Sequence, residues 1–137
     1  MKMLGISSEA LQEMFDHCRR EYPNEACGYL AGKEGRVTQA HPIHNDAQSP
    51  TFYEMNSAEQ LQVHRGIRQR GLEHLAVYHS HVATEAYPSR RDVERATAVQ
   101  DFFDGYYVLV TLKDSTPRAR VFKIQDGNAT EEPLVEA

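Results

Sequence analysis

"EHLAVYHSHVATEAYPSRRD", residues 73–92, is the stretch that decides how this chain is interpreted. Its first half is an apolar run with the alternation of a β-strand. Successive side chains of a strand point to opposite faces, so His79 and His81 point the same way. Leu75 and Val77 are expected on that same face, further back. The strand should therefore leave the core and present two imidazoles side by side at its C-terminal end.

Two imidazoles at this spacing can share one metal ion if a third ligand lies nearby. If a helix begins at Ser89, Asp92 falls in its first turn, close to the end of the strand. Two neutral nitrogens and one carboxylate oxygen form a zinc-type set, and a fourth position is left for water, as in catalytic sites. The same residues also have a structural explanation, because Ser-x-x-Asp is a common helix N-terminus. With seven histidines in the chain, H-x-H also arises easily by chance, so spacing alone leaves both interpretations open.

The rest of the chain predicts helices and strands without strict alternation. Helices are expected at residues 7–22, with Pro23 beyond the end, and at residues 56–71 and 89–105, the second capped by Asn56 or Ser57. Strands are expected at residues 26–32, 35–43, 73–81, 106–112 and 118–124. Residues 44–55 resemble a loop with a short extended piece, and the tail is compatible with a last edge strand. We therefore predict an α/β (α+β mixed) fold, a mixed β-sheet flanked by helices, in a single domain over residues 1–137.

Composition excludes several functional classes. A formal net charge of −5 argues against nucleic acid as the main partner. No apolar run approaches the roughly 20 residues that span a bilayer, and the first residues lack a signal peptide, so we expect a cytoplasmic protein without a membrane partner. Two cysteines are too few for a disulfide scaffold. Two arginine groups are interpreted as solvated helix faces, with a docking patch for an acidic protein as the alternative: Arg65, Arg68 and Arg70, and Arg90, Arg91 and Arg95.

Other metal and nucleophile motifs are absent from the sequence. There is no H-E-x-x-H, and no H-x-E with a downstream P-C-x-x-C, which excludes a nucleobase deaminase. In barrel amidohydrolases and polymerase-type phosphoesterases, H-x-H usually opens a much longer chain. Cys27 could act as a nucleophile in principle, but a buried small residue in a strand is the simpler interpretation.

The arrangement of H-S-H, seven residues, Ser, two residues and Asp resembles the signature of the JAMM (MPN+) metalloprotease family. That family also has a glutamate ahead of a Gly-containing strand, and "NEACGYLAG" places Glu25 in that context. The loop at 44–55 is similar to the family's Asn and Ser-Pro segment. Many relatives have proline where this chain has Val82, a difference that concerns loop shape. "ATEAYPS", residues 83–89, is similar to bacterial members that act on ubiquitin-like sulfur-carrier proteins.

The resemblance implies an MPN/JAMM fold and a zinc metalloprotease mechanism. One zinc ion per chain, with a bound water, would be held by His79, His81 and Asp92. Glu25 would transfer the proton, and Ser89 would stabilise the oxyanion. Glu85, in the loop after the histidines, would be the alternative base.

The implied substrate is a ubiquitin-like protein with a Gly-Gly tail, hydrolysed after its C-terminal glycine as an isopeptidase would do. Two alternatives belong to other classes: a non-catalytic scaffold or binding module of the same fold, and a zinc hydrolase of a small-molecule amide. A homodimer is compatible with such a chain, although no residue points to one.

Overall fold

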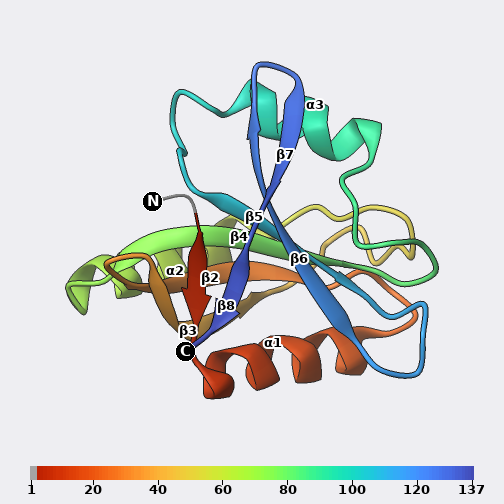
Figure 1. Ribbon diagram of the computed structural model, residues 1–137, viewed down its shortest axis with the longest axis horizontal. Helices are drawn as coiled ribbons and strands as arrows, with labels where there is room; N and C mark the ends of the chain where they lie inside the picture. Colours follow the sequence, from red (N-terminus) through yellow and green to blue (C-terminus); the bar gives the residue numbers. More distant parts are fainter. Residues whose placement is uncertain (1–2) are drawn as a thin grey trace.

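The computed structural model describes residues 3–137, in which one mixed sheet carries helices on both faces (Figure 1). The helices are α1 (Ser8–Glu21), α2 (Ser57–Gln69) and α3 (Arg90–Ala98). The strands are β1 (Leu4–Ile6), β2 (Cys27–Lys33), β3 (Arg36–Ile43), β4 (Glu73–His81), β5 (Tyr106–Thr111), β6 (Arg118–Gln125), β7 (Asn128–Glu132) and β8 (Leu134–Glu136). Their order is β7-β6-β5-β4-β2-β3-β1-β8. Because β4 is antiparallel to β2 and parallel to β5, the predicted α/β (α+β mixed) fold class is confirmed.

The C-terminal strands bring the two edges of the sheet together. β7 and β8 lie at opposite ends of the strand order, yet only Pro133 separates them in the chain. Two residues of extended chain span at most about 7 Å, so the edges must lie close to each other. β6 and β8 are indeed in contact, and Figure 1 shows β7 continuing directly into β8. The tail therefore forms the expected edge strand and adds a second strand at the other edge.

The two faces of the sheet bury separate apolar clusters, as β5 illustrates. Val108 and Val110 pack with buried residues of α1 on one face. Tyr107 and Leu109 point to the other face and pack with Ala96 of α3. This alternation follows from the two-residue period of a strand. In Figure 1, α1 and α3 accordingly lie on opposite sides of the sheet.

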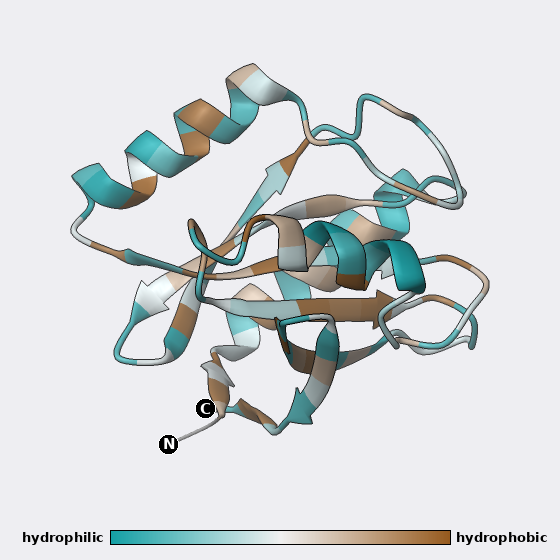
Figure 2. Ribbon diagram, turned by 90° about the horizontal axis from the view of Figure 1, so that it is seen from above, coloured by the Kyte–Doolittle hydropathy of each residue, from teal (hydrophilic) through white to brown (hydrophobic). Residues whose placement is uncertain are grey.

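The hydropathy of the chain follows this layering. Figure 2 shows hydrophobic residues concentrated along the strands, whereas hydrophobic and hydrophilic residues alternate along the helices. Such alternation is typical of helices that bury one side against a sheet. Between residues 3 and 137, no helix combines the length and the apolar character required to cross a membrane.

β4 is the central strand, and a bulge near its start changes which residues share a face. Leu30 of β2 pairs with Ala76, whereas the next residue pairs with His74, so Leu75 has no partner in the register. Leu75 packs with the cluster under α1, whereas Val77 packs with the cluster under α3. The expectation that these two residues share a face was therefore wrong, because an extra residue in a strand reverses the alternation before it.

α3 is shorter than predicted, since it ends at Ala98 rather than at residue 105. The chain beyond it turns so that Phe103 packs against the sheet. The centroid of its ring lies 4.5 Å from that of His74 and 5.7 Å from that of Tyr107. This packing is tertiary, and the local sequence pattern carries no information about it.

β1 was not predicted, because three residues are too few to show a periodic pattern. Its backbone pairs with β3 on one side and with β8 on the other, both in parallel. The second helix is capped by Asn56, whose side chain accepts a hydrogen bond from the Glu59 amide, so Asn56 rather than Ser57 is the cap.

The tight packing around Gly28 of β2, between its neighbours β3 and β4, gives a stability prediction. A Cβ atom added at Gly28 would lie 2.5 Å from the carbonyl oxygen of His41 and 2.5 Å from a ring carbon of the fully buried Tyr78. We expect Gly28→Ala to lower the free energy of unfolding by about 1–3 kcal/mol, since neither neighbour can move freely. Urea denaturation measures this change.

Gly66→Ala in α2 is the matched control. Its new Cβ would meet only the mobile guanidinium of Arg70, at 3.1 Å. Because alanine favours the helix, the free energy of unfolding should stay unchanged or rise by up to about 1 kcal/mol. Similar losses for both variants would contradict the packing argument.

Candidate metal centre

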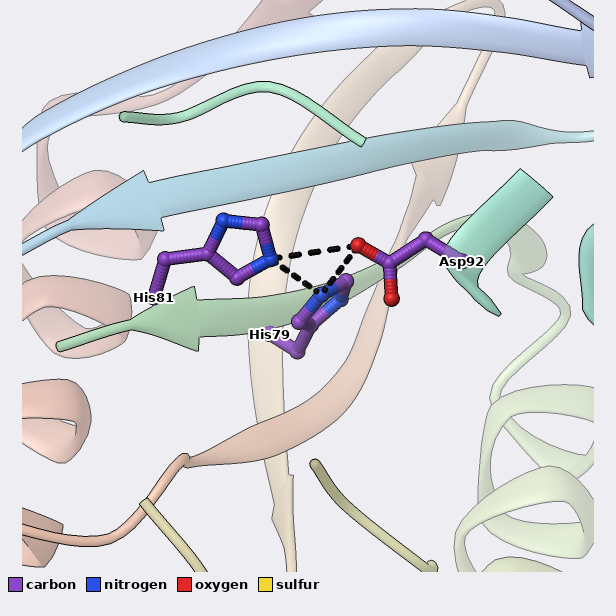
Figure 3. Close-up of side chains that lie close together, drawn as sticks. All are labelled: His79, His81 and Asp92. Atoms are coloured by element: carbon purple, nitrogen blue, oxygen red, sulfur yellow. Dashed lines mark hydrogen bonds and ion pairs between the residues drawn. The ribbon is translucent and has the colours of Figure 1, made fainter. Parts of the chain in front are cut away.

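Three ligand atoms from β4 and α3 converge at the end of the central strand (Figure 3). The Nε2 atoms of His79 and His81 lie 3.2 Å apart. Oδ2 of Asp92 lies 3.3 Å from the first and 3.1 Å from the second. Both histidines are buried and the aspartate is largely so. The structure thus brings together the three residues that the sequence pattern proposed as ligands.

The spacing of these atoms fits a single tetrahedral ion. Nitrogen and oxygen ligands at about 2.0–2.1 Å from zinc lie about 3.3–3.4 Å from one another in a tetrahedron. The observed separations of 3.1–3.3 Å are close to that value. A set of two imidazole nitrogens and one carboxylate oxygen is also a donor set that zinc accepts. The residues present are therefore compatible with a zinc site.

The tautomer of His81 is fixed by its surroundings. Its Nδ1 lies 2.9 Å from the backbone carbonyl oxygen of Glu85. Because a carbonyl oxygen can only accept, Nδ1 carries the proton, and in the neutral ring Nε2 presents its lone pair to the site. Such a hydrogen bond from the second ring nitrogen is typical of metal-ligating histidines. The buried Nδ1 of His79 has no such partner within residues 3–137.

Burial and hydrogen bonding shift the pKa values of all three groups. Burial lowers the pKa of His79, although Asp92 opposes this shift. Burial is the largest single influence on the pKa values of His81 and Asp92 and disfavours their charged forms, but the hydrogen bonds and charges of several neighbours together outweigh it. The pKa of His81 is consequently raised, and that of Asp92 is held well below its usual range. The carboxylate is therefore ionised and ready to meet a cation.

The structural and the functional interpretations of Ser-x-x-Asp are both realised, by the same atoms. Oγ of Ser89 accepts a hydrogen bond from the backbone N–H of Asp92 at 3.1 Å. In return, Oδ2 of Asp92 accepts one from the backbone N–H of Ser89 at 2.9 Å. This reciprocal capping box opens α3 and aims the same Oδ2 atom at the two histidines. The helix cap is thus the device that positions the third candidate ligand.

Glu25 lies next to this group without belonging to it. It lies two residues before the start of β2 at Cys27, and the residue is 5% exposed. Burial raises the pKa of Glu25 to about 7, with the nearby charges of His81 and Asp92 acting in opposite directions. These influences place the carboxyl group within electrostatic reach of the candidate ligands. An acid with a pKa near neutrality is suited to proton transfer.

Ser80 and Asn45 hold the segment that carries Glu25, and sequence reasoning assigned neither of them a role. Ser80 points away from the two histidines, and its Oγ accepts a hydrogen bond from the Ala26 backbone at 2.8 Å. Its own backbone N–H donates to the Ala26 carbonyl at 3.0 Å. The Asn45 side chain donates to the Glu25 carbonyl at 3.0 Å. For Ser80, strand alternation could have indicated this role, because a residue between two ligands on one strand must face the opposite side of the sheet.

The alternative base, Glu85, is turned away from the site. Its carboxylate is exposed and forms an ion pair with Lys113, whose hydrogen bond lowers the pKa of Glu85. Only its backbone carbonyl reaches the site, as the acceptor for His81. Cys27 is buried, and burial raises the pKa of its thiol to about 12, which agrees with a packing residue rather than a nucleophile.

A cavity of about 470 Å³ extends from the candidate ligands between α2, α3 and the sheet. His79 and Asp92 lie at one part of its wall, and Tyr53, His74 and Arg95 lie at others. The ring of Tyr53 packs over the imidazole of His79, with centroids 4.7 Å apart. The cavity size is within the range of sites that bind small molecules. The cavity therefore reaches two of the three candidate ligands, His79 and Asp92.

Two arginines of α3, Arg91 and Arg95, are exposed as predicted for a solvated helix face, and each also contacts an aromatic ring of the loop before α2. The guanidinium of Arg95 lies 4.4 Å from the ring centroid of Tyr53, and that of Arg91 lies 5.1 Å from that of Phe52. Arg95 also donates to the Tyr53 carbonyl at 2.7 Å. The aromatic pair in an otherwise polar loop was the sequence signal for this contact.

Comparisons with known proteins agree with this architecture. A family described as "Prokaryotic homologs of the JAB domain" matches residues 7–124. The chain is similar to the CysO-cysteine peptidase of Mycobacterium tuberculosis, with 44% identity over 135 residues, which cover 96% of this chain and 90% of that protein. It is 32% identical to a desampylase of Haloferax volcanii over 118 residues, which cover 81% of each protein.

A solved structure supports the same assignment. The solution structure of a protein from Desulfitobacterium hafniense superimposes with a TM-score of 0.86 at 32% identity and covers 98% of this chain and 93% of that one. The crystal structure of a JAB1/MPN domain protein from Archaeoglobus fulgidus superimposes with a TM-score of 0.61 at 17% identity and covers 97% of this chain and all of that one, which confirms the predicted MPN/JAMM fold. With most of its length matched by the family and by these relatives, the chain belongs to the prokaryotic JAB (JAMM/MPN) family.

Proposed function

We propose that this protein is a zinc-dependent hydrolase that cleaves the bond after the C-terminal glycine of a ubiquitin-like sulfur-carrier protein. The released group would be an attached amino acid or a lysine-linked protein. The observation that carries the proposal is the convergence of the His79, His81 and Asp92 ligand atoms beside a buried, protonatable Glu25. The names of the two relatives, a peptidase and a desampylase, support a peptide or isopeptide bond as the target.

The proposed zinc ligands are His79, His81 and Asp92. Zinc bound there would polarise the scissile carbonyl and lower the pKa of a water molecule to about 7. The residues themselves supply a fixed, ionised carboxylate and at least one imidazole whose lone pair is directed by its second-nitrogen hydrogen bond. This preorganisation means that little rearrangement is needed when an ion binds.

Glu25 is proposed as the group that moves the proton. Its carboxylate would accept a proton from water and later deliver it to the leaving amine. Without a cation, burial raises its pKa to about 7. A divalent ion nearby would favour the charged form, so the base would be ionised at neutral pH. Ser80 holds the backbone of Ala26, the next residue in the chain, and thus helps to fix the position of this carboxylate.

Ser89 is proposed as the donor to the oxyanion. Its Oγ acts as an acceptor in the helix cap, which leaves the hydroxyl proton free to donate. Its side chain is exposed at the edge of the site, where a substrate carbonyl could reach it. The cap and the oxyanion interaction therefore do not compete for the same hydrogen.

The first prediction from this proposed function tests the reaction and the base together. Glu25→Gln should keep the fold and the zinc but lose at least about 100-fold in hydrolysis, because proton transfer is removed and coordination is not. Mass spectrometry of a ubiquitin-like carrier with a C-terminal adduct measures cleavage by both proteins. Glu85→Gln, which alters the outward-facing acid, should remain active.

Three outcomes would contradict this scheme. An active Glu25→Gln together with an inactive Glu85→Gln would make the loop acid the base. Fast turnover of a small amide with an intact carrier conjugate would favour the small-molecule hydrolase. A zinc-loaded protein that binds the carrier and cleaves neither substrate would favour the scaffold.

The second prediction concerns the metal. Purified protein should hold about one zinc ion per chain, and His79→Ala, His81→Ala and Asp92→Ala should each weaken binding severely. Elemental analysis after dialysis measures this. His64→Ala is the control, because this exposed histidine lines the same cavity but lies outside the converging group. Zinc content unchanged in all three ligand variants would disprove the site.

The third prediction separates the two roles of Ser89. Ser89→Ala should retain zinc, lose about 1 kcal/mol of stability through the missing cap, and lose roughly 100-fold in turnover. Ser7→Ala is the matched control, since Ser7 caps α1 with the same 3.1 Å hydrogen bond far from the ligands. It should lose similar stability and keep full turnover. If both variants behave alike in turnover, Ser89 is only a cap.

A further inference from the structure

Arg95 occupies a defined position beside the candidate metal centre. It lies three residues after Asp92 on α3, so the two side chains start on the same face of the helix, about 5–6 Å apart. Its guanidinium packs over the ring of Tyr53 and donates one hydrogen bond to the carbonyl of that residue. Tyr53 in turn packs over His79. This stack keeps the cation in the cavity wall next to the ligand atoms.

The charge of Arg95 has no partner within residues 3–137, where the ion pairs found involve other residues. Two acids near the site are engaged otherwise: Asp92 faces the histidines and caps its helix, and Glu25 is buried and forms no ion pair within residues 3–137. A guanidinium has five N–H donors, of which the structure uses one at Tyr53. The remaining donors are suited to an anion, and a carboxylate matches their planar geometry.

We propose that Arg95 binds the α-carboxylate of the single amino acid that is released from the carrier. This inference rests on the proposed function and names the conjugate that the site prefers. In such a conjugate the carboxylate carbon lies only one Cα beyond the scissile nitrogen, about 2.5 Å away. It would therefore sit beside the reacting bond, where a side chain rooted one turn after Asp92 can reach it. In a lysine-linked conjugate, that position holds only methylene groups.

Arg91 provides an internal comparison. It belongs to the same helix and packs on Phe52 as Arg95 packs on Tyr53. Unlike Arg95, it does not line the cavity. Both arginines can hold the loop against α3, but only Arg95 is placed to meet a substrate. Comparing variants of Arg91 and Arg95 therefore distinguishes the effect of holding the loop from the effect of recognising the carboxylate.

The experiment compares carrier conjugates that differ only at the terminal carboxylate. One carrier ends in glycine followed by cysteine with a free carboxylate, and the second carries the cysteine carboxamide. Cysteine follows the name of the M. tuberculosis relative, and its thiol is common to both substrates. A third carrier is linked through the side-chain amine of lysine. Mass spectrometry gives kcat/KM for the wild type, Arg95→Gln and Arg91→Gln.

The wild type should prefer the free carboxylate over the carboxamide by at least about tenfold, as expected for loss of a charge-assisted hydrogen bond. Arg95→Gln should bring this ratio close to one by slowing only the free-carboxylate substrate. Cleavage of the carboxamide and of the lysine-linked carrier should change little. Arg91→Gln should keep the wild-type ratio.

Two results would overturn the assignment of Arg95 while hydrolysis itself persists. Equal cleavage of carboxylate and carboxamide by the wild type would show that the carboxylate is not recognised. An equal loss on both substrates in Arg95→Gln would make Arg95 a positioning residue for Tyr53 or for the charge of Glu25. Absence of cleavage of every carrier by zinc-loaded wild type would instead overturn the proposed function, and this inference with it.

Discussion

The convergence of three ligand atoms on one point depends on a strand and a helix start that are locked to each other. β4 presents two buried imidazoles on one face, and the capping box of α3 directs Oδ2 of Asp92 at both of them. Burying these polar groups together is costly unless their hydrogen-bonding and charge requirements are met. A cation shared by all three atoms meets those requirements. Any ion that binds only the folded state also stabilises that state by mass action.

Residues on the opposite face of β4 anchor the strand and so keep the two histidines in place. Tyr78 is fully buried and shares a 2.6 Å hydrogen bond with His17 of α1. Ser80, also fully buried, ties the backbone at Ala26 to the same strand. Each residue that faces the site thus alternates with one that anchors the strand to its neighbours. This explains how the candidate base Glu25, distant in sequence, is held beside the histidines.

The cavity wall brings together segments that the linear sequence keeps apart. The loop before α2 contributes Tyr53, the central strand contributes His74 through its bulge, and the segment after α3 contributes Phe103. Arg95 connects the loop to the helix that carries Asp92. The same stack that positions the loop also holds the Arg95 guanidinium in the cavity wall, where no acid of residues 3–137 forms an ion pair with it. In the proposed scheme, the same residue, Arg95, both shapes the cavity and selects the substrate by its terminal carboxylate.

The sequence by itself determined the elements whose signals are local. Strand alternation placed His79 and His81 together, the Ser-x-x-Asp pattern predicted a helix start, and the resemblance linked Glu25 and Ser89 to them. These signals are short-range, because they depend on the period of a strand and on hydrogen bonds within one helical turn. The limits of most strands, and the mixed sheet, followed in the same way.

Only the tertiary structure decided the rest, because it depends on contacts between distant residues. The bulge that removes Leu75 from the metal face arises from the pairing of β4 with β2. The early end of α3 accompanies the packing of Phe103 against the sheet, and the short strand β1 is held by its pairing with β3 on one side and β8 on the other. Likewise, nothing in the sequence distinguished Arg95 from the neighbouring arginines of the same helix. Its stack on Tyr53, and hence its place in the cavity wall, required the loop and the helix to fold against each other.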